Sequence, residues 1–240
     1  MKERFEIIII MGRPASGKSE VIDYLKKTPV EERIRRFHIG DFEEFDDFPM
    51  LWTWFEEDAI LEKTLKKPRL HTDSEGYFKF QYLWDLLIER ISMEYSKRLR
   101  DENYHDIKTA IIEFSRGSEH GGYRDAFEHL SDAILEKAAI FYIDVSFEES
   151  LRKNRQRFNP DRPDSILEHG LPDEKLTRLY GEVDWEEFKG DDPQFIPVRN
   201  YKIPYVVLKN EPDITTARDE NLGQALEELF RRLWKLSAVK

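Results

Sequence analysis

The chemistry of this sequence is concentrated near its amino end, where eight consecutive residues fit the pattern G-x-x-x-x-G-K-[ST]. These residues are Gly12, Arg13, Pro14, Ala15, Ser16, Gly17, Lys18 and Ser19. Glycines let the main chain fold closely around a ligand, so that successive N–H groups form a nest for an anion. Lys18 would reach the β- and γ-phosphates of a nucleotide, and the Ser19 hydroxyl would ligate Mg²⁺. The segment therefore predicts a triphosphate site.

Such a loop needs a buried strand before it and a helix after it, and the sequence predicts both. Residues 5–11 contain four consecutive isoleucines, which is typical of a strand buried on both faces of a parallel sheet. A helical pattern begins near Gly17 and continues through Val21, Ile22 and Leu25. The positive N-terminal end of that helix would face the same anion.

Short apolar strands alternate with helical patterns along the rest of the chain. Strands are expected at 36–39, 109–114, 139–145 and 205–208, and helices at 77–100, 123–137, 147–157 and 221–236. This alternation indicates an α/β doubly wound fold, whose ligands bind beyond the carboxyl ends of the strands. Residues 42–76 and 158–204 are rich in proline and charge, and they are interpreted as insertions.

Length and composition exclude several classes of protein. A chain of 240 residues fits one domain spanning 1–240, and 40% hydrophobic residues exclude a disordered chain. The chain has no cysteine, which excludes disulfides, thiolate metal sites and thiol nucleophiles. No apolar run is long enough for a membrane span, so we expect a soluble, cytoplasmic protein. The net charge of -11 disfavours a polynucleotide partner.

With its phosphate loop placed between a strand and a helix, the chain resembles the P-loop kinases of small molecules. This group contains nucleoside, nucleotide and related metabolite kinases. The resemblance implies three layers, a parallel five-stranded sheet of order 2-3-1-4-5, ATP with Mg²⁺ as the donor, and an arginine-rich lid. It places a helical acceptor-binding insertion at 42–105 and the lid at 148–204.

The resemblance also implies roles for residues near strand ends. Asp41, after the expected second strand, takes the place of an acid that orients the acceptor hydroxyl; a turn or helix-cap aspartate is the alternative. Glu113 takes the place of an acid that holds Mg²⁺ through water, with a solvated carboxylate as the alternative. Arg116 resembles arginines that bind phosphate, but its spacing departs from the family versions, which leaves an ion-pair or surface role open.

The segment after the fourth strand resembles the start of a kinase lid. Arg152, Arg155 and Arg157 would neutralise the charge that develops on the transferred group. A solvated basic helix face is the alternative. At the end of the fifth strand, Asn210 is a candidate for lining the adenine site, and a turn-forming asparagine is the alternative there.

The segment 41–62 combines nine acids with six aromatic residues and contains no Lys, Arg or His. Its negative field would repel a phosphorylated acceptor, whereas its aromatic faces would stack on a base or hold a cation. We therefore expect a neutral or cationic small-molecule acceptor, such as a nucleoside. In the alternative, the acids form a solvated face and the aromatic residues form a core or a homodimer contact.

The sequence thus predicts an ATP- and Mg²⁺-dependent phosphotransferase that acts on a small-molecule hydroxyl. The alternative is a P-loop ATPase or a nucleotide-binding regulatory protein without a second substrate. A GTPase would carry N-K-x-D near the fifth strand, where this chain has Lys209 to Asp213 as K-N-E-P-D. No H-E-x-x-H or comparable cluster occurs, so a metal held by protein ligands alone is not expected.

Overall fold

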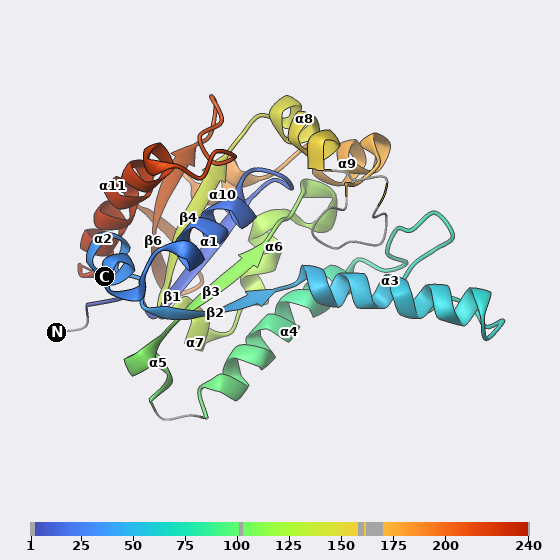
Figure 1. Ribbon diagram of the computed structural model, residues 1–240. Helices are drawn as coiled ribbons and strands as arrows, with labels where there is room; N and C mark the ends of the chain where they lie inside the picture. The colour runs from blue at the N-terminus through green and yellow to red at the C-terminus, as the bar shows by residue number, and fades with distance from the viewer. Residues whose placement is uncertain (1–2, 101–102, 158–160, 162–169, 240) are drawn as a thin grey trace.

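The computed structural model describes residues 3–100, 103–157, 161 and 170–239. These residues form a six-stranded sheet of order β2-β3-β1-β4-β6-β5 (Figure 1). The strands are β1 (Ile7–Gly12), β2 (Asp41–Asp46), β3 (Lys108–Phe114), β4 (Ala138–Asp144), β5 (Phe195–Val198) and β6 (Tyr201–Lys209). Neighbouring strands are parallel except for β5, which pairs antiparallel with β6.

Helices cover both faces of the sheet and give three layers, as the α/β doubly wound class requires. One face is covered by α1 (Lys18–Lys27), α2 (Val30–Phe37) and α11 (Glu220–Ser237). The other is covered by α4 (Tyr82–Arg98), α6 (Gly122–Glu128), α7 (Asp132–Leu135) and α10 (Trp185–Lys189). The remaining elements are α3 (Phe48–Lys63), α5 (Tyr104–Ile107), the 3₁₀ turn η1 (Ser118–His120), α8 (Phe147–Arg157) and α9 (Asp173–Tyr180).

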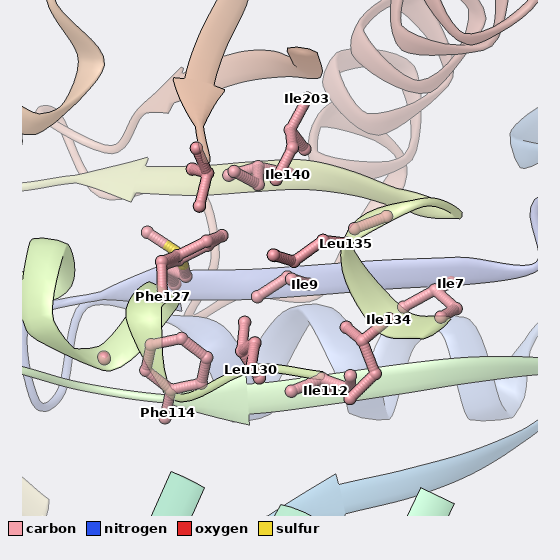
Figure 2. Close-up of a cluster of buried hydrophobic side chains, with 14 of the residues drawn as sticks. Ile7, Ile9, Ile112, Phe114, Phe127, Leu130, Ile134, Leu135, Ile140 and Ile203 are labelled. Atoms are coloured by element: carbon pink, nitrogen blue, oxygen red, sulfur yellow. The ribbon is translucent and has the colours of Figure 1, made fainter. Parts of the chain in front are cut away.

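The isoleucine run of β1 occupies the centre of the sheet, and its side chains alternate between the two cores. Ile7 and Ile9 pack with the helices of one face, as Figure 2 shows, whereas Ile8 and Ile10 pack with the helices of the other. All four side chains are fully buried. Burying one such side chain contributes about 1.5–3 kcal/mol, so this strand anchors the phosphate loop that follows it.

The second strand lies later in the chain than the sequence predicted, and that prediction was wrong. Residues 36–37 end α2, and the strand β2 is Asp41–Asp46. β2 is the edge strand of the sheet, so its polar side chains can face solvent and it needs no continuous apolar run. Phe42 and Phe45 face opposite sides and supply its core contacts.

The five parallel strands follow the expected order 2-3-1-4-5 when they are counted among themselves, with β6 in the fifth place. β5 was not predicted, because it lies in the proline-rich segment that was interpreted as an insertion. It forms a hairpin with β6 and adds an antiparallel edge. Figure 1 shows α3, which lies in the segment 42–105, extending away from the sheet. Among the described helices, none has the length and hydropathy that a bilayer crossing requires.

Candidate active site

The phosphate loop joins β1 to α1 at the carboxyl edge of the sheet. Gly12 and Gly17 have φ values of 156° and 114°, a conformation that side chains rarely allow. A Cβ on Gly12 would lie 2.7 Å from the Ile143 carbonyl oxygen, so space as well as conformation requires glycine there. Gly17 caps α1 without a side-chain hydrogen bond, which leaves the first-turn N–H groups directed at the cleft.

Lys18 lies in the first turn of α1 with its side chain 7% exposed. Its Nζ donates to the Arg13 carbonyl at 3.1 Å and to the Ser115 hydroxyl at 2.8 Å, and lies 3.9 Å from a Glu113 carboxylate oxygen. Burial lowers the pKa of Lys18, and the nearby carboxylates offset part of that effect. The ammonium is therefore held by neutral oxygens that a phosphate could replace.

Two carboxylates flank this ammonium at the ends of neighbouring strands. Asp46 of β2 pairs in register with Glu113 of β3. Burial raises the pKa of both, and the charges of Glu113 and Asp47 raise that of Asp46 further. The Asp46 side chain is also more than a third exposed to the cleft, so solvent moderates its shift. A bound cation would reduce the repulsion between these two carboxylates.

The oxygens at this edge fit Mg²⁺. Ser19, Asp46 and Glu113 all line one open cleft of about 680 Å³, and hydroxyl and carboxylate oxygens are the ligands that this ion prefers. Within the described ranges, no group of three or more His, Asp or Glu side chains is placed to hold a metal ion by protein ligands alone. The ion would therefore need phosphate oxygens as well, which is usual for Mg²⁺ in nucleotide sites.

Asp41 does not lie where the sequence predicted it, and this placement needs correction. It is the first residue of β2, exposed, and paired in register with Lys108 at the start of β3. Because the strands are parallel, this is the sheet edge opposite the phosphate loop. The acid at the carboxyl end of β2 is Asp46, which sequence reasoning missed because the expected strand ended too early.

Arg116 follows β3 and lies beside the cleft in a buried ion pair. Its Nη1 donates to Asp47 Oδ2 at 2.5 Å and to the Ser115 carbonyl at 2.8 Å, and its Nη2 donates to the Trp84 carbonyl. The side chain is 2% exposed. The ion-pair alternative is therefore the one observed, because the guanidinium donors are directed to protein oxygens rather than to the phosphate loop.

The three lid arginines of α8 separate into two groups. Arg152 pairs with Glu149, and Arg155 pairs with Asp173; both are exposed and neither lines the cleft. Arg157 does line the cleft, and its charge opposes the rise in the Glu113 pKa. Residues 158–160 and 162–169 of the expected lid lie outside the described residues, whereas 170–204 contain α9, α10, β5 and the start of β6.

Two further predicted residues connect the loop to other segments. Asn210 is fully buried, and its Nδ2 donates to the Ser16 carbonyl and to Thr215 Oγ1, both at 2.9 Å. It therefore ties the end of β6 to the phosphate loop and does not line the cleft. Arg13 donates from its side chain to the carbonyls of Tyr180 and Gly181, which connects the loop to the end of α9.

One buried cation near the loop was not predicted from the sequence. Lys153 of α8 lines the cleft, and its Nζ donates to Asp213 Oδ1 at 3.2 Å and to Thr215 Oγ1 at 3.0 Å. It stands between Arg152 and Arg155 in a strongly basic helix, so the sequence alone did not distinguish it from its solvated neighbours.

The side chains of the acidic and aromatic segment 41–62 lie in several different places. Asp46 and Asp47 lie at the cleft, whereas Asp58 is buried and accepts hydrogen bonds from the N–H groups of residues 70–72. Trp54 belongs to a small core with α4. Four other apolar residues, Phe48, Leu51, Trp52 and Phe55, line a second cavity beside the cleft. The acids of this segment therefore lie in different places and do not form the single negative field that the sequence predicted.

Comparison with solved structures gives distant matches, among them three kinases. No protein-family model matches the sequence, and a search of curated proteins finds no match. A sugar kinase from Janibacter sp. HTCC2649 overlaps 95% of this chain and 98% of its own, at 12% identity and a TM-score of 0.44. A gluconokinase from Sinorhizobium meliloti 1021 overlaps 96% and 97%, at 15% identity and a TM-score of 0.45.

A third match is a shikimate kinase from Acinetobacter baumannii in complex with shikimate. It overlaps 73% of this chain and 76% of its own, at 15% identity and a TM-score of 0.34. These three structures are of kinases that act on small molecules. Overlaps with TM-scores this low do not establish what this chain does, so its function has to be inferred from the cleft itself.

Proposed function

We propose that this protein is an ATP- and Mg²⁺-dependent phosphotransferase that moves the γ-phosphoryl group to a hydroxyl of a small molecule. One observation carries the proposal: the phosphate loop, its lysine and two strand-end carboxylates open into one cleft, which continues into a second cavity. A nucleotide alone would use the loop and the cleft. The adjoining cavity gives a second substrate a place beside the transferred group.

The donor half of the reaction uses the loop. Main-chain N–H groups at the start of α1 bind the triphosphate, and Lys18 exchanges its carbonyl partners for phosphate oxygens. Ser19 and Glu113 are the residues we assign to Mg²⁺, with Glu113 acting through water. When bound, the ion neutralises charge on the β- and γ-phosphates. These assignments fit the cleft because both side chains line it.

The acceptor half of the reaction uses Asp46. A substrate hydroxyl oxygen forms the new bond to phosphorus, the bond from phosphorus to the β,γ-bridging oxygen breaks, and Asp46 takes the hydroxyl proton. Its raised pKa suits this role, because a carboxylate with a higher pKa holds a proton more strongly. Asp46 thus takes the function that the sequence reasoning gave to Asp41.

Arg157 is the lid residue that we assign to the transition state. It lines the cleft, whereas Arg152 and Arg155 are exposed and paired elsewhere. A fixed cation near the transferred group stabilises the charge that develops there. The acceptor itself is neutral or weakly charged, as in a nucleoside, since Asp46 and Glu113 would repel a phosphate brought to the same place.

The decisive measurement separates transfer to an alcohol from transfer to water. The purified protein is incubated with Mg·ATP, and ADP, free phosphate and phosphorylated product are quantified with and without a panel of small alcohols. We expect ADP formation to rise with an alcohol and to match the phosphorylated product. ADP formation matched by free phosphate, and unchanged by every alcohol, would favour an ATPase instead. Calorimetric titration with Mg·ATP checks donor binding independently.

A further inference from the structure

A second cavity of about 390 Å³ lies against the phosphate cleft, and the proposed function leaves its chemistry unassigned. The two hollows have five lining residues in common: Phe48, Leu51, Trp84, Leu171 and Tyr180. Asp46 and Asp47, which directly precede the shared residue Phe48, line the cleft, as does Arg116, which donates to Asp47 and to the carbonyl of the shared residue Trp84. A molecule in the cavity could therefore reach the transferred group with one end. The volume lies in the range typical of small-molecule sites.

The walls of the cavity are largely aromatic. They come from α3, from residues 76–81, from α4 and from α9, and the aromatic members are Phe48, Trp52, Phe55, Tyr77, Phe78, Phe80, Trp84 and Tyr180. Flat apolar faces favour a flat ligand, because rings stack in offset or edge-to-face arrangements. A ligand rich in hydroxyl groups would lose its water there without gaining equivalent hydrogen bonds.

The charged groups that reach the cavity already have interactions within the protein. Arg178 pairs with Glu119 at 2.8 Å and lies over the Tyr77 ring, and Lys175 lies 5.1 Å from the centre of that ring. At the boundary with the cleft, Arg116 is neutralised by Asp47. Arg178 and Arg116 are thus each balanced by a carboxylate, whereas Lys175 contacts the Tyr77 ring and the Gly76 carbonyl. With most of its charge balanced and its walls largely aromatic, the cavity suits an uncharged ligand.

One polar side chain of the wall has a hydrogen-bonding position with no partner. His120 is 2% exposed and stacks on Trp84 with ring centres 3.8 Å apart. Burial lowers the pKa of His120 to about 3, so the ring is neutral. Its Nδ1 accepts from the Gly117 N–H at 3.4 Å, so the ring proton belongs on Nε2. Nε2 has no hydrogen-bond partner among the described residues, and less than 1 Å² of it is exposed, so a ligand reaches it only after a small movement of the wall.

The geometry points to an uncharged heteroaromatic alcohol as the phosphoryl acceptor, an inference that rests on the proposed kinase function. Its ring lies among the aromatic side chains, a ring nitrogen or carbonyl oxygen accepts from His120, and its hydroxyl passes the shared residues toward Asp46. The site would thus select against sugars and sugar acids. Such selection is strong where a buried polar group requires its partner, because the wrong ligand leaves that group unpaired.

Binding to the wild-type protein, measured by calorimetry without nucleotide, tests the class of acceptor. The panel contains adenosine, thymidine and pyridoxine as heteroaromatic alcohols, and glucose, gluconate and shikimate as hydrophilic ones. We expect at least one heteroaromatic alcohol to bind roughly tenfold or more tightly than every hydrophilic compound, since one good stacking contact supplies that difference. Tighter binding of a hydrophilic compound, or no binding by any heteroaromatic alcohol, overturns the inference.

The hydrogen bond to His120 is tested with a matched pair of ligands that needs no variant. 3-Pyridinemethanol and benzyl alcohol have nearly the same shape and differ in one ring nitrogen. The wild-type protein should bind the pyridine several-fold more tightly, by the amount that one hydrogen bond contributes. Equal binding would remove the polar part of the inference. His120→Phe keeps a ring against Trp84 and should abolish the preference.

Substitutions on one helix test the location of the acceptor. Trp52→Ala removes an aromatic wall of the cavity, whereas Ile60→Ala removes an exposed side chain of α3 that lines neither hollow. Trp52→Ala should weaken the binding of the preferred acceptor roughly tenfold and leave Mg·ATP binding unchanged, and Ile60→Ala should change neither. Acceptor binding equal in both variants contradicts the location. Failure of Mg·ATP binding in the wild type would instead contradict the kinase function.

Discussion

The phosphate cleft and the cavity beside it, called below the donor half and the acceptor half of the site, recognise their ligands by different means. The donor half is built from main-chain N–H groups of consecutive residues between β1 and α1, with one lysine and one hydroxyl added. The acceptor half is built from side chains of α3, α4, η1 and α9, which are far apart in the chain. A change of side chain leaves the main-chain part of donor recognition intact, whereas it alters the acceptor half directly. The fold can therefore keep its donor while its acceptor changes.

The buried cations of the two halves show the same contrast. Lys18 is bonded to neutral carbonyl and hydroxyl oxygens, and the nearest carboxylate oxygen recorded is 3.9 Å away. Arg116 is paired directly with Asp47 at 2.5 Å. Breaking a buried ion pair is costly, because it leaves an uncompensated charge. Lys18 can therefore exchange partners when a phosphate enters, whereas Arg116 keeps its own and supports the wall of the acceptor side.

The strongest test of the donor half is Lys18→Ala. We expect turnover of ATP to fall by roughly 1000-fold, since a charge aimed at the transferred phosphate is lost. The fold should persist, because burial already disfavours the charged form of Lys18. Steady-state ADP formation and the far-ultraviolet circular dichroism spectrum measure the two effects. Full turnover in a folded variant would show that the donor half binds its ligand by another route.

Asp46→Asn tests the proposed general base, which lies between the donor half and the acceptor half. We expect kcat to fall roughly 100-fold, the usual contribution of a general base. In the wild type, activity should rise with pH through the raised pKa of Asp46, because only the unprotonated carboxylate accepts the hydroxyl proton. The variant should lack that rise in its pH–rate profile. Asp41→Asn, at the opposite sheet edge, is the control and should leave both properties unchanged.

Arg157→Ala tests the lid. We expect kcat to fall about 10- to 100-fold, with a smaller change in the affinity for Mg·ATP, because the cation acts mainly on charge that develops during transfer. Arg152→Ala and Arg155→Ala serve as matched controls from the same helix and should stay within about twofold of wild type, as exposed ion pairs contribute little. A larger loss in either control would mean that the lid arginines rearrange on closure.

Asn210→Ala should have a smaller effect, which is mainly structural. It removes the bonds from β6 to the Ser16 carbonyl and to Thr215. We expect a loss of about 1–3 kcal/mol in stability, the cost of leaving buried polar groups unpaired. The KM for ATP should rise several-fold while kcat changes little. Thermal unfolding and initial rates at varied ATP provide the comparison, and an unchanged KM would show that this support does not shape the loop.

The smallest expected effect is on the pH dependence of stability. Because the folded protein raises the pKa of Asp46, the folded state holds that proton more tightly than the unfolded state. The resulting stability is present below about pH 4 and is lost as pH rises through the raised pKa. Asp46→Asn cannot ionise, so without Mg²⁺ its Tm should exceed that of wild type by roughly 2–6 °C at pH 8.5. The Tm values should converge at pH 4, and a constant difference would contradict the assignment.

The phosphate loop of the donor half could be predicted from the sequence because its residues are consecutive. The spacing from Gly12 to Ser19 specifies the loop, and the isoleucines of β1 require burial on both faces of a central strand. The order of the parallel strands followed from the resemblance and is confirmed. β2 was misplaced because an edge strand can carry Asp and Glu outward, so the apolar signal used for buried strands did not apply.

Only the tertiary structure decided which charges face the cleft. Asp41 and Asp46 are alike in the sequence, yet parallel pairing with β3 places them at opposite edges of the sheet. Arg152, Arg155 and Arg157 share one basic helix, yet Arg152 pairs with Glu149 of the same helix, Arg155 pairs with Asp173 of α9, and Arg157 lines the cleft. Local spacing therefore determined the phosphate loop, because adjacent residues form it. The acceptor side depended on contacts between distant segments, which no local pattern specifies.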